Sequence, residues 1–164
     1  MVYWITGMSG CGKTTLGKAL YAKIKSTGRN AVFLDGDDMR KIFCDGLGYT
    51  YDDRKTCAFR YSRLCSYLSE QGTDVVCSTV SMFHSVRQWN RENIADYCEI
   101  YLKCSDEILK DRDYKNVYAK DNVVGKDVLA ETPEDPDLIF FSDSMTVASM
   151  VEEIINWRKK YDKD

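Results

Sequence analysis

The chain has 164 residues, of which 44% are apolar, and this size and composition predict one folded domain spanning residues 1–164. Its formal net charge of -3 argues against a protein that coats nucleic acid or an anionic membrane, since both partners need a basic face. Seven cysteines without a C-x-x-C pair, no apolar run long enough to span a membrane and no signal peptide predict reduced thiols in a cytoplasmic protein.

Short apolar runs alternate with longer amphipathic segments along the chain, which is typical of a parallel sheet with helices on both faces. The predicted strands are Val2–Thr6, Asn30–Leu34, Asp74–Ser78, Glu99–Leu102 and Leu138–Phe141. The predicted helices are Lys13–Ser26, Asp37–Phe43, Tyr51–Gln71, Ser85–Asp96, Ser105–Asp111 and Met145–Lys160. The expected fold class is therefore α/β, a doubly wound and mainly parallel five-stranded sheet.

A glycine-rich stretch, GMSGCGKTT, stands between the first predicted strand and the first predicted helix. It matches G-x-x-x-x-G-K-[ST] at every fixed position, and in this context backbone N–H groups and the positive helix end surround the phosphates of a nucleotide. Lys13 should reach the β- and γ-phosphates, and the Thr14 hydroxyl should ligate Mg²⁺. The predicted ATP-binding residues of this loop are Gly7, Ser9, Gly10, Cys11, Gly12, Lys13, Thr14 and Thr15. The alternative is a glycine-rich turn that only packs.

Three classes of nucleotide-binding protein fit such a loop: a switch GTPase, a mechanical ATPase and a kinase acting on a small molecule. A GTPase normally carries an N-K-x-D tetrapeptide that reads guanine, and the sequence has none. A mechanical ATPase normally needs further domains to move, and the chain is short. A kinase with a small acceptor is the leading prediction, and a non-catalytic nucleotide sensor is the alternative from another class.

Two carboxylates, Asp35 and Asp37, stand at the end of the second predicted strand in FLDGDDMR. Open α/β sheets bind their ligands at the carboxyl ends of the strands, so both carboxylates should face the phosphates. Together with Lys13 they are the predicted catalytic residues: Asp35 organises Mg²⁺ with Thr14, and Asp37 accepts a hydrogen bond from the acceptor hydroxyl and aims it at the γ-phosphorus. The alternative is that Asp37 simply caps the next helix, which leaves Asp35 unexplained.

The segment Arg112–Pro136 has no clear period of apolar residues and is rich in both signs of charge. A loop of this length in a compact domain is usually functional. We therefore predict a lid at about 112–136, whose closure would keep water away from the γ-phosphate.

Several stretches, taken together and in order, resemble the adenylyl-sulfate kinase family. They are GMSGCGKTT, LDGDDMR, LGYTYDDRKTCAFR, the VSMF after the third predicted strand, and DYKNVY followed by ETPEDPDL. The resemblance covers nearly the whole chain. It implies a doubly wound P-loop kinase that uses ATP and Mg²⁺ and transfers the γ-phosphate to the ribose 3′-hydroxyl of adenylyl sulfate.

The resemblance also implies which residues bind the acceptor. By motif position, Asp37 corresponds to the carboxylate that meets the acceptor hydroxyl, and Arg40 and Arg54 correspond to the arginines that hold the phosphate-sulfate group. The planar forks of these arginines and of Arg60 suit an anion with several oxygens. The alternative for each arginine is a solvated charged surface.

Four further residues correspond to binding positions of the family. Tyr49 falls where the family places a Phe under the acceptor's adenine, with an ordinary half-buried aromatic as the alternative. Ser81 occupies the serine of the family's I-S-P-Y turn, where the main chain lines the acceptor site. Arg112 and Lys115 fall in the family's lid beside ATP.

The chain departs from the family's pattern at positions that bear on the acceptor. Cys57 replaces an Asn, which removes an amide near the sulfate and leaves a weak S–H donor. The family's I-S-P-Y-R is V-S-M-F-H here, so His84 replaces a residue that is always charged, with a surface histidine as the alternative. In the lid, Val123 or Val124 stands near the position of a second adenine-stacking Phe. One aromatic wall is then missing, and such a wall is worth about 1–3 kcal/mol.

These departures predict a kinase of this family whose acceptor is either adenylyl sulfate or another activated nucleotide. A smaller base and an amidate in place of sulfate, as in the cytidine diphosphoramidate of capsule-sugar decoration, would suit the lost Phe and the lost Asn. The expected partner is a small-molecule nucleotide, with no nucleic acid and no membrane. The sequence leaves the oligomeric state open, with a homodimer as one option.

Overall fold

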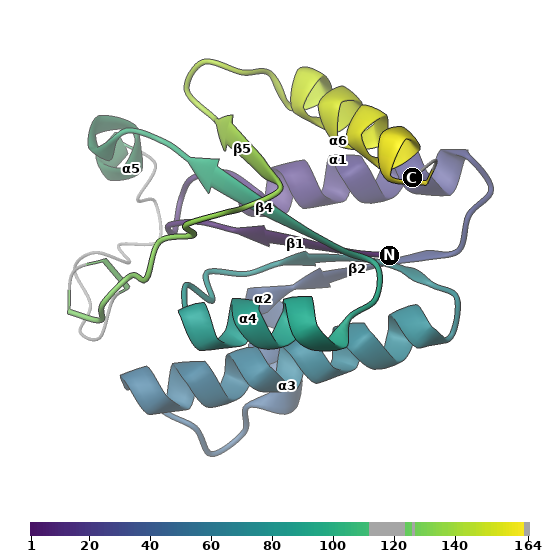
Figure 1. Cartoon of the computed structure of the whole chain (residues 1–164). Helices are drawn as coiled ribbons and strands as arrows, with labels where there is room; N and C mark the ends of the chain where they lie inside the picture. Colours follow the sequence, from purple (N-terminus) through teal and green to yellow (C-terminus); the bar gives the residue numbers. More distant parts are fainter. Residues whose placement is uncertain (112–123, 126, 163–164) are drawn as a thin grey trace.

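The computed structural model of the chain describes residues 1–111, 124–125 and 127–162, and its helices and strands alternate along the chain (Figure 1). The strands are β1 (Val2–Thr6), β2 (Ala31–Asp35), β3 (Asp74–Ser78), β4 (Tyr97–Lys103) and β5 (Leu138–Phe141). The helices are α1 (Lys13–Ser26), α2 (Gly36–Phe43), α3 (Tyr51–Glu70), α4 (His84–Asn93), α5 (Asp106–Asp111) and α6 (Val147–Tyr161). Every predicted strand and helix is therefore present.

The five strands form one sheet in the order β2-β3-β1-β4-β5, and every neighbouring pair is parallel. All five residues of β1, VYWIT, are buried, as expected for a parallel strand covered on both faces. This confirms the predicted fold class. β2 includes Asp35, which pairs in register with Ser78, so the strand ends one residue later than predicted. The sheet thereby carries this carboxylate to its edge.

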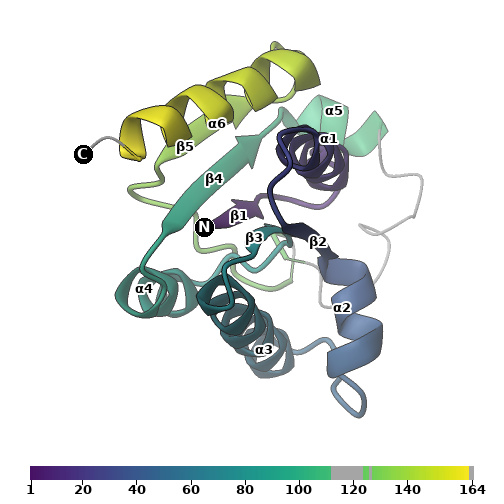
Figure 2. The same ribbon diagram turned by 90° about the vertical axis from the view of Figure 1, so that its right-hand side faces the viewer.

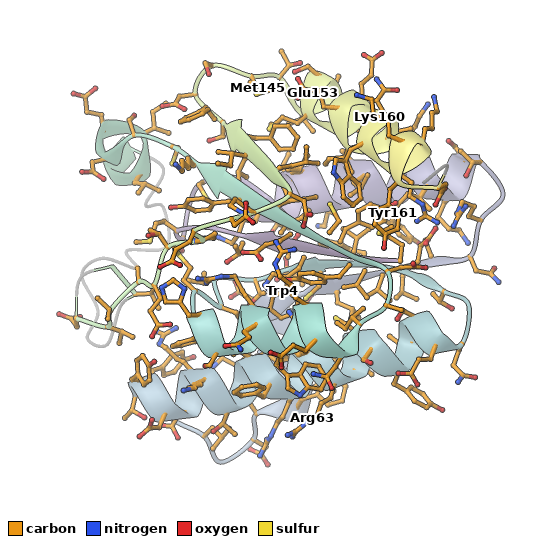
Figure 3. All side chains as sticks on the ribbon, in the orientation of Figure 1. Trp4, Arg63, Met145, Glu153, Lys160 and Tyr161 are labelled. Atoms are coloured by element: carbon orange, nitrogen blue, oxygen red, sulfur yellow. A yellow bond between two sulfur atoms is a disulfide. The ribbon has the colours of Figure 1, made fainter. Side chains whose placement is uncertain are left out.

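Two apolar layers cover the two faces of the sheet, and helices lie on both sides (Figures 1 and 2). Tyr3 and Ile5 of β1 pack into the layer with α1 and α6, whereas Val2 and Trp4 pack into the layer with α3 and α4. Figure 3 shows Trp4 on the side of the sheet that faces α4. This alternation follows from the period of two residues along a strand.

The boundaries of the helices differ slightly from the predicted ones. The clearest difference is the end of α4, which was predicted at Asp96 and lies at Asn93, because Ile94 already has an extended backbone. Among the described residues, no helix combines the length and the apolar character that crossing a membrane requires.

Candidate active site

The phosphate-binding loop joins β1 to α1 at the carboxyl edge of the sheet. Gly7 has φ +151°, and a Cβ atom there would lie 2.2 Å from the Leu102 carbonyl oxygen, so a side chain cannot be accommodated. Gly12 precedes α1 with φ +96°, a left-handed conformation that glycine adopts without strain. The glycines thus let the loop turn sharply and present the N-terminus of α1, which is a favourable place for a phosphate.

The side chain of Lys13 is buried inside this loop. Its Nζ atom donates a hydrogen bond to the Met8 carbonyl oxygen at 2.7 Å. Burial lowers the pKa of Lys13 from its ordinary value, while the charges of Cys11, Asp37 and Asp35 favour its protonated form. Both predicted catalytic carboxylates therefore lie close enough to act electrostatically on the loop lysine.

Thr14 and Asp35, the predicted ligands of Mg²⁺, are in direct contact. The Thr14 hydroxyl donates to Asp35 Oδ2 at 2.7 Å. The other carboxylate oxygen, Oδ1, accepts the backbone N–H of Asp37 at 2.9 Å. Asp35 is consequently the N-cap of α2, so the alternative in which Asp37 caps this helix is wrong. It is wrong because the helix begins at Gly36, which places Asp37 inside the first turn.

The contact between Thr14 and Asp35 fits a magnesium ion that arrives with a nucleotide. Both side chains offer oxygen atoms, which Mg²⁺ prefers, and the ion is usually held by one or two protein groups together with substrate phosphates. Within the described residues, no group of three or more His, Cys, Asp or Glu side chains forms a metal site. Nucleotide phosphates and water would complete the six ligands that Mg²⁺ prefers.

Two predicted acceptor-binding arginines meet at Tyr49, in the loop between α2 and α3. The guanidinium of Arg40 lies 4.0 Å from the centre of the Tyr49 ring, and that of Arg54 lies 5.1 Å from it. Arg54 Nε also donates to the Tyr49 carbonyl oxygen at 3.0 Å, and Arg40 donates to the Gly48 carbonyl. The aromatic face attracts both cations, and Tyr49 as a whole remains 55% exposed. Arg40, Tyr49 and Arg54 form what we call the arginine–tyrosine cluster.

Cys57 lies beside this cluster, and its sulfur meets that of Cys44, with the two Cα atoms 5.8 Å apart. The sequence spacing does not reveal this approach, because only folding brings the end of α2 against α3. Arg40 Nη1 lies 3.5 Å from Cys57 Sγ. Cys57 therefore offers a nucleotide at most a weak S–H donor.

Ser81 and Arg60, two residues considered for the acceptor site, both have side chains that bond to other parts of the protein. The turn after β3 is tied to β1, since Thr79 N donates to the Ile5 carbonyl at 3.0 Å. Ser81 is buried in this turn, and its hydroxyl pairs with the Thr79 hydroxyl at 2.7 Å, while the role of its main chain in the acceptor site stays a prediction. Arg60 instead donates to the Phe43 carbonyl at the end of α2, which is a structural contact.

Three predicted site residues, Arg112, Lys115 and Val123, lie outside the described residues. The neighbouring Val124 is described, and it is buried in a small apolar cluster with Met82, Tyr101 and Val128. Val124 therefore packs inside the protein, and its isopropyl group offers no aromatic face to a base.

Glu131 is a residue near the site that the sequence patterns did not single out. Its carboxylate accepts hydrogen bonds from the Tyr51 hydroxyl at 2.6 Å and from the backbone N–H of His84. Glu131 stands in the charged ETPEDPD run, where nothing in composition or period separates it from the other acidic residues.

The parallel sheet, the glycine-rich loop with its buried lysine, and the two carboxylates beside it define a P-loop kinase. Comparison with known proteins agrees, since the family model for adenylylsulphate kinase matches residues 1–140 of the chain. The chain belongs to the adenylylsulphate kinase family, and it is a nucleotide kinase that phosphorylates a hydroxyl group. The resemblance drawn from the motifs is thereby confirmed.

Several relatives are similar over nearly their whole length. Cytidine diphosphoramidate kinase of Campylobacter jejuni is 39% identical, and the match covers 94% of this chain and 94% of the relative. Adenylyl-sulfate kinase of Halothermothrix orenii is 34% identical, with 94% of this chain and 86% of the relative covered. Among solved structures, the Mycobacterium tuberculosis APS kinase CysC in complex with AMPPNP and APS has a TM-score of 0.89 at 26% identity, with 96% of each chain covered.

Proposed function

We propose that the chain transfers the γ-phosphate of ATP to the ribose 3′-hydroxyl of an activated nucleotide. The observation that carries this proposal is the convergence of Lys13, Thr14 and Asp35 at the carboxyl edge of the sheet. There the Thr14 hydroxyl oxygen lies 2.7 Å from Asp35 Oδ2. Asp37 follows on the first turn of α2, and the same helix leads to Arg40. The short helix α2 therefore connects the ATP side of the site, at Asp35, with the acceptor side, at Arg40.

On the ATP side, the loop between β1 and α1 should cradle the phosphates. Its backbone N–H groups and the N-terminus of α1 face the anion, and Lys13 would exchange its hydrogen bond to the Met8 carbonyl for the β- and γ-phosphates. Thr14 and Asp35 would hold Mg²⁺, which supplies charge neutralisation at the transferring phosphate. The cations Arg112 and Lys115 of the proposed lid would add to this charge.

On the acceptor side, Asp37 should accept the hydrogen bond of the ribose hydroxyl and orient it in line with the γ-phosphorus. Asp37 is exposed, and its backbone N–H is fixed by Asp35 at 2.9 Å, so the start of α2 is held in place. Arg40 and Arg54 would receive the modified phosphate of the acceptor, because guanidinium groups match anionic oxygens in pairs. Tyr49 would lie under the base.

We further propose that the preferred acceptor is a cytidine nucleotide whose terminal phosphate carries an amino group, as in cytidine diphosphoramidate. Cys57 offers a sulfate at most a weak S–H donor, where the family has an Asn amide. Val124 is packed among apolar side chains near the position of the family's second stacking Phe. The similarity to the Campylobacter jejuni kinase, at 39% identity, supports the same choice.

Steady-state kinetics with saturating ATP test the choice of acceptor. We expect kcat/KM for cytidine diphosphoramidate to exceed that for adenylyl sulfate by at least about tenfold, which corresponds to ~1.4 kcal/mol of transition-state binding. A kcat/KM for adenylyl sulfate near or above about 10⁵ M⁻¹s⁻¹ would show that the departures are harmless and that adenylyl sulfate is the acceptor.

A further inference from the structure

The Glu131 carboxylate is shared by the two helices that border the proposed acceptor site. Oε1 accepts a hydrogen bond from the Tyr51 hydroxyl at 2.6 Å, and Oε2 accepts one from the backbone N–H of His84. The backbone N–H of Glu131 donates to the Met82 carbonyl at 3.1 Å. One residue therefore contacts the first residue of α3, the turn after β3 and the first residue of α4.

The N-terminus of α4 receives its cap from this carboxylate. Phe83 stands at the N-cap position and makes no side-chain cap, and the first turn of α4 contains no acidic residue. Glu131 supplies both a hydrogen-bond acceptor and a negative charge at the positive end of the helix. Removing its carboxylate should therefore loosen the start of α4 and the turn that precedes it.

The protonation states keep this arrangement intact at neutral pH. Burial raises the pKa of Glu131, but the hydrogen bonds from Tyr51 and His84 outweigh burial and hold the pKa below its usual value. The hydrogen bond to Glu131 raises the pKa of Tyr51 to about 12. The carboxylate is thus charged and the phenol protonated, so their contact is a charge-assisted hydrogen bond.

Tyr51 links the carboxylate to the arginine–tyrosine cluster. Its ring meets Phe83 edge to face, with centroids 5.1 Å apart and planes at 88°, so Tyr51 is held by the turn as well as by the carboxylate. Tyr49 lies two residues before it, and Arg54 lies about one helical turn after it on α3. A shift of Tyr51 would therefore displace Tyr49 and Arg54, two of the three members of the cluster, relative to Ser81.

We propose that Glu131 is a positioning residue for the acceptor, because it holds the start of α3, with Tyr49 and Arg54, against the turn between β3 and α4. The inference rests on the proposed function, in which these two segments are the walls that receive the nucleotide. The hydrogen-bond partners of Glu131 named above all lie outside the phosphate-binding loop. Its loss should therefore affect the acceptor and spare ATP.

The test compares Tyr51→Phe, Glu131→Ala and Glu131→Gln with the control Tyr67→Phe. Tyr67 lies on the same helix, and its side chain is largely exposed, so the control removes the same oxygen away from the site. The acceptor is adenylyl sulfate or cytidine diphosphoramidate, whichever the wild type uses with the higher kcat/KM. We expect Tyr51→Phe and Glu131→Ala to raise the KM for this acceptor about tenfold, with the KM for ATP changed less than about twofold.

Two further comparisons separate positioning from a general loss of stability. Glu131→Gln should recover part of the loss, since its amide oxygen can still accept the Tyr51 hydroxyl. Tyr51→Phe should add little in the Glu131→Ala background, because the partner is already gone. If Glu131→Ala does not fold, Tyr51→Phe decides the matter alone, since it removes a single oxygen.

An unchanged acceptor KM in folded Tyr51→Phe and Glu131→Ala would overturn the positioning role and leave the proposed function standing. Equal increases in the KM values for ATP and acceptor would also overturn it. If the wild type phosphorylates neither nucleotide, the proposed function fails first, and the positioning role fails with it.

Discussion

Replacing Lys13 with alanine is expected to lower the rate of phosphoryl transfer at least about a hundredfold while the chain remains folded. The lysine is the cation of the phosphate-binding loop, and its loss leaves the charge on the transferring phosphate uncompensated. The truncation removes one hydrogen bond, from Lys13 Nζ to the Met8 carbonyl oxygen, and such a bond contributes about 0.5–1.5 kcal/mol, so the chain should remain folded. The rate of formation of phosphorylated acceptor is measured alongside thermal unfolding by circular dichroism.

Lys18→Ala is the matched control for this variant. Lys18 is an exposed lysine five residues further along α1, and its loss removes the same charge from the same helix. The control should keep wild-type activity. A folded Lys13→Ala protein with activity within about tenfold of the wild type would contradict the kinase mechanism.

Replacing Asp37 with asparagine is expected to lower kcat by at least about a hundredfold and to leave the affinity for ATP nearly unchanged. The carboxylate is assigned to the acceptor hydroxyl, so its loss should be felt in the chemical step. The backbone N–H of Asp37, which donates to Asp35, is retained in the variant. kcat is obtained at saturating concentrations of both substrates, and ATP affinity is obtained by titration calorimetry.

The neighbouring Asp38→Asn variant controls for the loss of one negative charge. Asp38 is exposed and pairs with Lys41 at 2.8 Å on the outer side of α2, and such a surface pair contributes little. It should keep wild-type kinetics. A fall in ATP affinity with unchanged kcat in Asp37→Asn would reassign Asp37 to the metal.

The sheet and the phosphate-binding loop could be predicted because their signals are local in the sequence. Strand β1 is an unbroken apolar run, and GMSGCGKTT encodes its own turn through Gly7 and Gly12, whose positive φ values the structure shows. The position of the carboxylates at the carboxyl end of β2 followed from the rule that open α/β sheets bind ligands at that edge. None of these three predictions depends on which helices pack against each other.

The remaining features of the site depend on contacts between distant segments. Cys44 and Cys57 are 13 residues apart, and only the packing of α2 against α3 brings them together. Glu131 is 80 residues from Tyr51 in sequence, yet the two are joined by a hydrogen bond of 2.6 Å. Neither pair has a period or a spacing that would reveal it, so a single sequence could not predict either contact.

The role of Tyr49 shows the same limit on a smaller scale. The family resemblance assigned Tyr49, Arg40 and Arg54 to the same acceptor site. It did not indicate that both guanidiniums would lie within about 5 Å of the centre of the Tyr49 ring. The ring thus organises the two cations, and under the proposed function it also stacks on the base of the acceptor.

The most direct test of the account is to follow the γ-phosphate itself. The chain is incubated with Mg²⁺, ATP labelled at the γ-phosphate, and either cytidine diphosphoramidate or adenylyl sulfate, and the products are identified by phosphorus NMR and mass spectrometry. The label is expected on the ribose 3′-hydroxyl of the nucleotide, with one ADP formed for each nucleotide phosphorylated. Bound but intact ATP with both acceptors would identify a nucleotide sensor, and release of the label as inorganic phosphate alone would identify an ATPase. Either result would contradict the account.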